Sequence, residues 1–229
     1  TNDFKDTVTV SGKDVKIRDA NDLNADVTAT GNAELQSDGN LTVSGTSNDL
    51  TTNSGGTTSF GETTLTGKLD ATSQDSITQT GKLVVDGTSG ITSTNGDVTL
   101  LDPTNDFKDT VTVSGKDVKI RDANDLDADV TASSDAELQA GGILSAVLDI
   151  KGNSTLTSGG NTTVSGTSND LTTNSGGTTS FGETTLAGKL DATSQDSITQ
   201  TGKLVVDGTS GITSTNGDVT LLDPTNDFK

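Results

Sequence analysis

Residues 104–126 read TNDFKDTVTVSGKDVKIRDANDL, and residues 1–23 repeat this stretch letter for letter. The chain also ends on TNDFK, at residues 225–229, so the same motif starts a third time. Self-similarity of this kind is the mark of a repeat protein. We therefore divide the chain into copy one (residues 1–103), copy two (residues 104–224) and the start of a third copy, and we expect the parent array to be longer.

Inside each copy, apolar residues come in pairs two positions apart, which is the period of a β-strand with one buried face. The pairs are short, and Gly, Asn, Asp and Ser separate them, as in SGKD at 11–14 and TNGD at 94–97. These residues favour turns. Examples of the pairs are Val8/Val10, Val15/Ile17, Val27/Ala29, Leu41/Val43, Leu83/Val85 and Val98/Leu100.

Similar pairs return after 18 to 20 residues: Val8 to Val27, Ile17 to Leu35 and Val98 to Val118. The spacing predicts an all-β parallel β-helix, or β-solenoid, with about 20 residues per rung and about 11 rungs. Copy one then contains five turns of about 20.6 residues, and copy two six turns of about 20.2. Copy two is longer by 18 residues, which we place at 143–160 and interpret as one extra rung. We expect one continuous solenoid with no break at residues 103/104.

Two other interpretations of the composition need to be weighed. Only 28% of the residues are hydrophobic and the net charge is −19, as in disordered chains. Disorder gives no reason for apolar pairs at a fixed period. A tandem immunoglobulin-like adhesin stalk fits a step of about 100 residues, but its core normally contains Trp and Tyr, and this chain has neither. We therefore prefer the solenoid.

The missing residue types limit the chemistry. The chain has no Cys and no His, so it lacks thiolate nucleophiles, the commonest general base and the commonest metal ligand. Its acidity disfavours nucleic acids and anionic membrane surfaces, and no apolar run reaches the length of a membrane span. We expect a protein that is not an enzyme, with no catalytic, cofactor-binding or metal-binding residues and no cofactor.

The segments NLTVSGTSNDL (40–50), GKLVVDGTSGITSTNGDVTLLD (81–102) and DTVTVSGKDVKIRD (6–19) resemble the repeats of filamentous-haemagglutinin-type exoproteins. This resemblance implies a right-handed parallel β-helix, export by two-partner secretion, and a role in adhesion and biofilm formation. It covers the whole chain in style, without a diagnostic motif and without the secretion domain of that family. Autotransporter passenger domains are similar to the same degree.

Two Asp-rich clusters raise the question of calcium, which prefers oxygen ligands. Their spacing departs from an EF-hand, because Leu23 stands at the fifth position and the glycine is missing. We favour solvated turns instead. The clusters are Asp19, Asn21, Asp22 and Asp26 in copy one, and Asp122, Asn124, Asp125, Asp127 and Asp129 in copy two.

Three further patterns have a structural and a functional interpretation. Thr-x-Thr triplets on one face could bind ice, but their gaps are irregular and Thr is common on exposed strands. Carboxylate pairs assisted by Arg18 or Arg121 could cleave polysaccharide, but surface charge is the simpler explanation. The Phe residues could anchor a partner, but we favour filling of a wider rung. The triplets are Thr7/Thr9, Thr28/Thr30, Thr78/Thr80 and Thr92/Thr94, and the Phe residues are Phe4, Phe60, Phe107, Phe181 and Phe228.

Together these patterns predict a structural rod or filament segment of a large bacterial adhesin, extracellular or at the cell surface, that supports adhesion and biofilm contacts. The alternative is a carbohydrate-binding or polysaccharide-processing β-helix protein. The expected partners are further repeats of the same protein end to end, by covalent continuity or self-assembly into a filament, and other cells or surface glycans. We expect no nucleic acid partner and no membrane insertion, and only weak calcium bridging between acidic faces.

Overall fold

A computed structural model describes residues 2–229, which form 28 β-strands and divide into two compact units, residues 2–122 and 123–229. Thr1, the first residue of copy one, lies outside the described residues. Within residues 2–229, no helix is long and apolar enough to cross a membrane.

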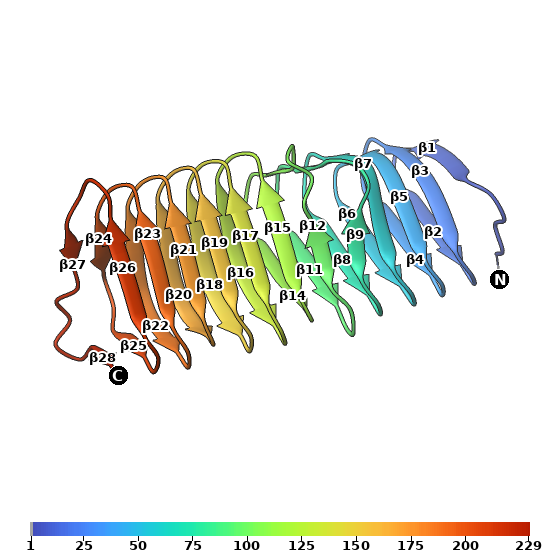
Figure 1. The fold of residues 1–229 in the computed structure, drawn as a ribbon. Coiled ribbons are helices and arrows are strands. Elements are labelled where there is room, and N and C mark those ends of the chain that lie inside the picture. The colour runs from blue at the N-terminus through green and yellow to red at the C-terminus, as the bar shows by residue number, and fades with distance from the viewer. Residues whose placement is uncertain (1) are drawn as a thin grey trace. The chain divides into compact units, whose positions relative to one another are not determined.

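The first unit contains two parallel sheets, and consecutive strands of the chain alternate between them (Figure 1). One sheet has the order β1 (Val8–Gly12), β3 (Leu23–Ala29), β5 (Leu41–Ser47), β7 (Thr58–Leu65), β9 (Ile77–Gln79), β12 (Val98–Leu100) and β15 (Val118–Asp122), with β10 (Leu83–Val85) and β13 (Asp106–Phe107) beside the second half of β7. The other has β2 (Val15–Asp19), β4 (Ala33–Ser37), β6 (Leu50–Ser54), β8 (Leu69–Ser73), β11 (Ser89–Ser93) and β14 (Val111–Gly115).

The second unit is built in the same way. One of its sheets contains β17 (Ala136–Ala140), β19 (Ser154–Ser158), β21 (Leu171–Ser175), β23 (Leu190–Ser194) and β26 (Ser210–Ser214). The other contains β16 (Leu126–Ala132), β18 (Leu144–Ile150), β20 (Thr162–Ser168), β22 (Thr179–Leu186), β24 (Ile198–Gln200), β27 (Val219–Thr220), β25 (Leu204–Val206) and β28 (Asp227–Phe228).

Each turn of the chain adds one strand to each sheet, so both units are parallel β-solenoids, as the sequence predicts. Strands pair in parallel with the strand one turn away, for example β3 with β5 and β21 with β23. An immunoglobulin-like sandwich is built from antiparallel strands. The tandem sandwich alternative is therefore wrong.

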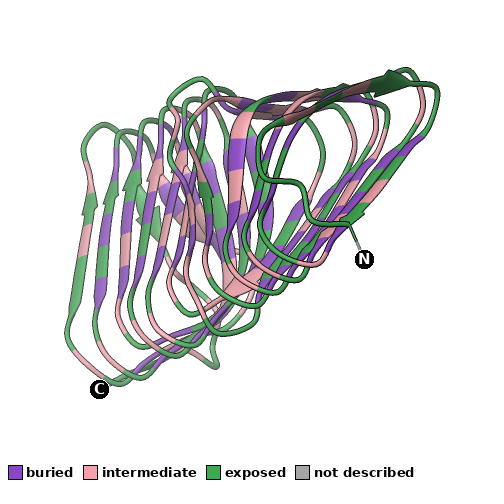
Figure 2. Ribbon diagram, turned by 90° about the vertical axis from the view of Figure 1, so that its right-hand side faces the viewer, coloured by how far each residue is buried: buried purple, intermediate pink, exposed green. Residues whose placement is uncertain are grey.

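The core is thin and is made of small side chains. Along the strands buried and exposed residues alternate (Figure 2). In β3, for example, Leu23, Ala25, Val27 and Ala29 are buried and the three residues between them are exposed. Buried Ser residues supplement the aliphatic ones at the strand ends, where their hydroxyls bond to turn carbonyls. Ser54 and Ser73 both donate to the carbonyl oxygen of Gly56, at 2.9 and 2.6 Å. A core that uses serine in this way explains how 28% hydrophobic residues suffice.

The strand register tests the predicted pairings. Val98 pairs with Val118 and Leu100 with Ile120, so strands on the two sides of Pro103 are neighbours within the first unit. Ile17 pairs with Leu35, so the spacing of these two residues in the sequence is one turn. The spacing from Val8 to Val27 is two residues longer than one turn, because Val8 pairs with Ala25 and Val10 with Val27.

The predicted number of turns per repeat needs a correction. From β1 the first unit makes five full turns to reach β12, and β14, the counterpart of β1 in copy two, follows in the opposite sheet. A step of 103 residues is therefore five and a half turns of about 18.7 residues, not five of 20.6. The same sequence VTVSG lies in one sheet at residues 8–12 and in the other at 111–115.

The 18 extra residues of copy two, 143–160, form one complete turn. In the first unit β3 pairs directly with β5, whereas in the second unit β18 lies between their counterparts β16 and β20. In the same way β19 separates β17 from β21. With this turn the two copies make 12 turns, where about 11 were predicted.

The turns of the solenoid become longer after a register shift in β5, because one strand is then followed by two shorter ones in the same sheet. The shift lies between Val43 and Gly45, and beyond it β7 pairs with two separate strands, β9 and β10. Gly45 has a φ of +118°, and a Cβ there would overlap the carbonyl oxygen of Val27. Phe60 is fully buried where the turns widen, as is its counterpart Phe181, and Phe107 is buried beyond the same shift. Core filling is thus confirmed for these three, whereas Phe4 and Phe228 are exposed.

Candidate functional site

The two Asp-rich clusters begin with buried carboxylates that bond to the backbone. Asp19 is fully buried, and its two oxygens accept the N–H groups of Phe4 and Asn21 at 2.8 and 2.9 Å. Asp122, its counterpart, accepts the N–H of Phe107 at 2.7 Å. These hydrogen bonds compensate the loss of water contacts that burial imposes on the two carboxyl groups. These carboxylates hold the TNDFK segment against the next strand.

The next members of the clusters form ladders along the turns of the solenoid. Asp22 Oδ1 accepts the N–H of Asn40, one turn later, at 2.7 Å, and Asn40 Oδ1 accepts the N–H of Thr57 at 2.9 Å. In the second unit, Asp125 Oδ1 accepts the N–H of Ile143 at 2.7 Å and Asn161 Oδ1 that of Thr178 at 2.9 Å.

A second ladder follows the other bend of each turn. Asp14 Oδ1 accepts the N–H of Asn32 at 3.1 Å, and Asp49 Oδ1 that of Lys68 at 3.0 Å. Asp135 and Asp170 make the same bond in the second unit, to Asn153 at 2.8 Å and Lys189 at 2.8 Å. The abundance of Asn and Asp at the bends thus serves the fold.

Glycine leaves the room that each ladder oxygen needs. A Cβ added at Gly39 would overlap Asp22 Oδ1, and one added at Gly142 would overlap Asp125 Oδ1. The sequence contains a signal for these ladders. An Asp or Asn that accepts the bond is followed about 18 positions later by a Gly and then by the residue that donates its N–H, as Asp22 is followed by Gly39 and Asn40.

The remaining acidic residues of the clusters are spread over other surfaces. Asp26, Asp127 and Asp129 lie on the exposed faces of β3 and β16 and do not share a bend with Asp22 or Asp125. Among residues 2–229, no group of three or more Asp or Glu residues is placed to hold a metal ion.

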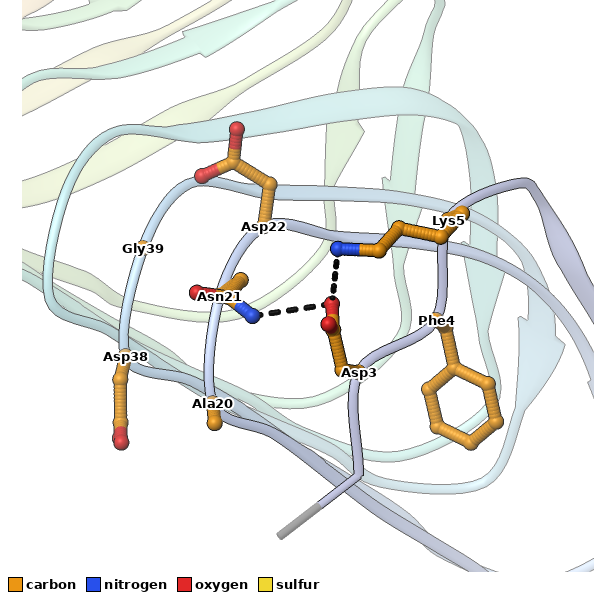
Figure 3. A pocket seen from close by; sticks show the side chains of 8 residues that line it. All are labelled: Asp3, Phe4, Lys5, Ala20, Asn21, Asp22, Asp38 and Gly39. Carbon is orange, nitrogen blue, oxygen red and sulfur yellow. Dashed lines mark hydrogen bonds and ion pairs between the residues drawn. The ribbon is translucent and has the colours of Figure 1, made fainter.

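A recess beside the first turn is lined in part by acidic side chains (Figure 3). Asp3 accepts hydrogen bonds from Lys5 and Asn21 at 2.7 and 2.9 Å, and the bond from Lys5 is the main reason that the pKa of Asp3 lies below its usual value. Arg18 forms an ion pair with Asp38, in which Arg18 Nη2 lies 3.6 Å from Asp38 Oδ1. The recess is lined by Asp3, Phe4, Lys5, Ala20, Asn21, Asp22, Asp38 and Gly39.

The triplets of threonine do not stack into one array. Thr9 pairs with Asp26, and Thr28 pairs with Ser11. Thr78 lies in one sheet and Thr92 in the other. The ordinary interpretation, threonine on exposed strand faces, agrees with these positions.

A buried asparagine was missed by sequence reasoning. Asn105 is fully buried, and its Oδ1 accepts hydrogen bonds from Gln79 Nε2 and the N–H of Leu83, at 2.9 and 2.8 Å. Its Nδ2 donates to Gln79 Oε1 at 2.9 Å and to the carbonyl oxygens of Leu100 and Arg121 at 3.4 and 3.2 Å. Asn105 therefore joins three successive segments of the stack, and nothing in its local sequence distinguishes it from an Asn in an exposed turn.

Comparison with known proteins gives one result. A family model described as "Repeats of unknown function (DUF5649)" matches residues 47–114, 115–175 and 168–229. The first and third matches begin at Ser47 and Ser168, which are equivalent positions of the two copies. No curated protein and no solved structure matches the chain.

Proposed function

We propose that this chain, which belongs to the DUF5649 family of repeats of unknown function over most of its length, is a structural rod segment of a large bacterial adhesin. In this proposal the segment is extracellular or at the cell surface, acts as a non-catalytic scaffold, and has further repeats as its end-to-end partners. The adhesive part of the proposal rests on the resemblance of residues 40–50 and 81–102 to filamentous-haemagglutinin-type repeats.

The observation that carries the scaffold role is the whole-turn insertion at 143–160. The flanking strands β16 and β20 each pair with the inserted strand β18, and the sequence on both sides is nearly the same as in copy one. Each turn of a solenoid contacts only its neighbours. A part whose role is to provide length accepts such a change, whereas a site built from several turns would be pulled apart by it.

The ladders support the same role. Every bend described above joins side chain to backbone across turns, so neighbouring turns are tied together at their bends as well as along their strands. The net charge of −19 supports solubility and keeps neighbouring copies from packing side by side.

The alternative, a polysaccharide-binding or polysaccharide-processing protein, gains no specific support. Glycoside hydrolysis needs a pair of carboxyl groups free to act as acid and as base or nucleophile. Asp19 and Asp22 instead accept backbone hydrogen bonds, and Asp3 is paired with Lys5. Calcium bridging between acidic faces stays a prediction.

A length series in bacteria that display the parent protein would test the proposal. One variant lacks 143–160, a second duplicates it, and a third lacks only 143–151. We expect cell–cell adhesion to survive the two whole-turn changes and to be lost with the third, because nine residues is half a turn and takes the strands beyond it out of register.

Substitutions on exposed strand faces supply the matched control, since a scaffold tolerates them. Asp26→Asn and Asp129→Asn should leave adhesion unchanged. Turnover of a polysaccharide by the purified chain, abolished by a single Asp or Glu substitution, would contradict the scaffold function.

A further inference from the structure

Both prolines of the chain directly follow an aspartate. They are Pro103 and Pro224, at equivalent places of the two copies, in the connections that follow β12 and β27. An Asp–Pro bond is unusually labile in acid. The aspartate carboxyl forms a five-membered ring with its own carbonyl carbon, and intramolecular attack of this kind is strongly favoured. The proline nitrogen, which carries an extra alkyl substituent, is also the more basic leaving group.

The bond between Asp102 and Pro103 lies at the surface of the first unit. Pro103 and Thr104 are exposed and Asp102 is partly exposed, so water reaches the bond. Asn105, the next residue, is fully buried, and the hydrogen bonds to its side chain described above fix the backbone there. The bond is therefore both accessible to water and held in one geometry.

The carbonyl oxygen of Asp102, which belongs to this bond, accepts the N–H of Asn105 at 3.2 Å. Negative charge develops on this oxygen when a nucleophile adds to the carbonyl carbon, and an N–H that is already in place stabilises that charge. Asp223 repeats the contact, because its carbonyl oxygen accepts the N–H of Asn226 at 3.2 Å. The backbone at each Asp–Pro bond thus favours addition to the carbonyl carbon.

A short turn fixes the Asp102 carboxylate. Its Oδ1 accepts the N–H of Thr104 at 2.9 Å and the hydroxyl of Thr104 at 2.6 Å. These bonds, first of all that from the hydroxyl, lower the pKa of the carboxyl, and the charges of Arg121 and Lys82 lower it further. The carboxylate therefore stays ionised, and nucleophilic, in mild acid. Both bonds engage Oδ1 and leave Oδ2 for an attack.

We propose that the chain cleaves itself in acid between Asp102 and Pro103, and at the equivalent bond between Asp223 and Pro224. Oδ2 of Asp102 adds to the carbonyl carbon of the same residue, and the bond from that carbon to the Pro103 nitrogen breaks. The nitrogen takes a proton from water and leaves as an amine. A water molecule then opens the cyclic anhydride and leaves two carboxyl groups on Asp102. The net reaction is hydrolysis of one peptide bond.

Contacts that span the cut hold the two pieces together. Strand β12, before the cut, pairs with β15 after it. Asn105 bonds to Gln79 at 2.9 Å, and Lys108 Nζ lies 2.6 Å from Asp86. The inference goes beyond the scaffold function: in acid, a rod of such repeats keeps its shape but loses its covalent continuity once per repeat.

Mass spectrometry after incubation in acid locates the cut. At about pH 3 we expect pieces that end at Asp102 to form at least about tenfold faster than pieces that end at Asp86, an exposed bend residue followed by Gly87. A denaturing gel should separate the pieces, whereas gel filtration under native conditions should show a chain of unchanged size. Equal rates at the two bonds, cleavage only of chain unfolded in urea, or separation of the pieces in gel filtration would overturn the proposal.

Variants at residue 102 test the attacking group, with the bond after Asp223 as the standard within the same molecule. Asp102→Asn removes the carboxylate, and Asp102→Glu keeps it but requires a larger ring. Each should slow cleavage at 102/103 at least about tenfold and leave cleavage at 223/224 unchanged. Pro103→Ala should slow the first cut likewise, because it removes the basic leaving group.

Circular dichroism checks that each variant is folded, since loss of structure alone changes access to every bond. An Asp102→Asn chain that is folded and cleaved at the original rate would overturn the attack by the carboxylate. Equal slowing at 102/103 and 223/224 would also contradict it. The scaffold function has its own test in the length series, which involves no acid.

Discussion

Asp125 and Gly142 interlock across one turn of the solenoid: the space that a Cβ of Gly142 would fill is occupied by Asp125 Oδ1, which accepts the N–H of Ile143 at 2.7 Å. The acceptor and the space for it come from different turns. Neither residue can therefore change without an effect on the other.

A double-mutant cycle measures this coupling. Asp125→Ala removes the acceptor of one backbone N–H and should cost about 1 kcal/mol of unfolding free energy. Gly142→Ala forces the carboxylate aside and should cost about 1–2 kcal/mol. The double variant should cost less than the sum, by about 1 kcal/mol, because the remaining atoms nearest to the new Cβ are 3.3 Å away.

Two control variants separate the ladder from general effects in urea unfolding. Asp129→Ala removes the same charge from an exposed strand face, and Gly90→Ala places a Cβ no closer than 3.9 Å to other atoms. Both should change stability by less than about 0.5 kcal/mol. Strict additivity of Asp125→Ala and Gly142→Ala would show that the interlock has no energetic role.

Thr52→Val should stabilise the chain. The Thr52 hydroxyl is buried and has no hydrogen-bond partner among the described residues. Removing it relieves a desolvation cost at nearly constant shape, and we expect a gain of about 1 kcal/mol. Thr58→Val is the matched control, because Thr58 donates to Ser54 at 3.2 Å, and it should destabilise. Thermal unfolding of both variants gives the sign.

Asn105→Ala and Asn226→Ala compare two equivalent residues that share the bonds to a Gln side chain and a Leu N–H, while Asn105 also donates to two carbonyl oxygens of neighbouring segments. Asn105 is fully buried, and its loss leaves Gln79 and the N–H of Leu83 without their partner. We expect a cost of about 2–4 kcal/mol there and about 1 kcal/mol at the partly exposed Asn226. Hydrogen exchange at Leu83 and Leu204 reports each site separately, and equal costs would argue against burial as the cause.

Deletion of 143–160 should give a folded chain, because it brings Asn161 to the place that Ile143 holds beside Asp125, as Asn40 lies beside Asp22. Deletion of 143–151 should abolish cooperative unfolding of the second unit, since a half turn places the following strands on the wrong sheet. Far-ultraviolet circular dichroism and urea titration distinguish the two. Equal tolerance of both deletions would contradict the assignment of 143–160 as a turn.

Acid should weaken the turn that contains Asp102. Hydrogen bonds from the hydroxyl and N–H of Thr104 hold the pKa of Asp102 below its usual value near 3.9. A lowered pKa in the folded state contributes stability above the usual pKa, and this contribution disappears as the pH falls through the lowered one. The stability difference between the native chain and Thr104→Val should therefore be constant above about pH 5 and shrink below pH 4. A pH-independent difference would show that the hydroxyl acts on packing alone.

Much of the fold can be predicted from the apolar pairs, because every second side chain points to the core in a strand that buries one face. The pairing of Ile17 with Leu35 and of Val98 with Val118 is predictable in this way. The pairing of Val8 is not, since β3 has apolar residues at 25, 27 and 29, and a slip of two positions preserves the match.

The half turn was not predictable for a related reason. Both sheets use the same alternation of small apolar and polar residues, so the pattern does not say on which sheet a strand lies. The role of Asp22 in a ladder could have been found from the Gly39–Asn40 pair one turn later. Asn105 could not, because its partner Gln79 is 26 residues away and belongs to an earlier turn.

The repeat of five and a half turns has a genetic consequence. Gain of one 103-residue copy would lengthen the stack and also turn everything distal to it to the opposite side, whereas gain of two would restore the original facing. Gain of 18 residues lengthens without turning. The number of repeats in the gene would thus determine both the length of the stack and the side to which its distal part faces.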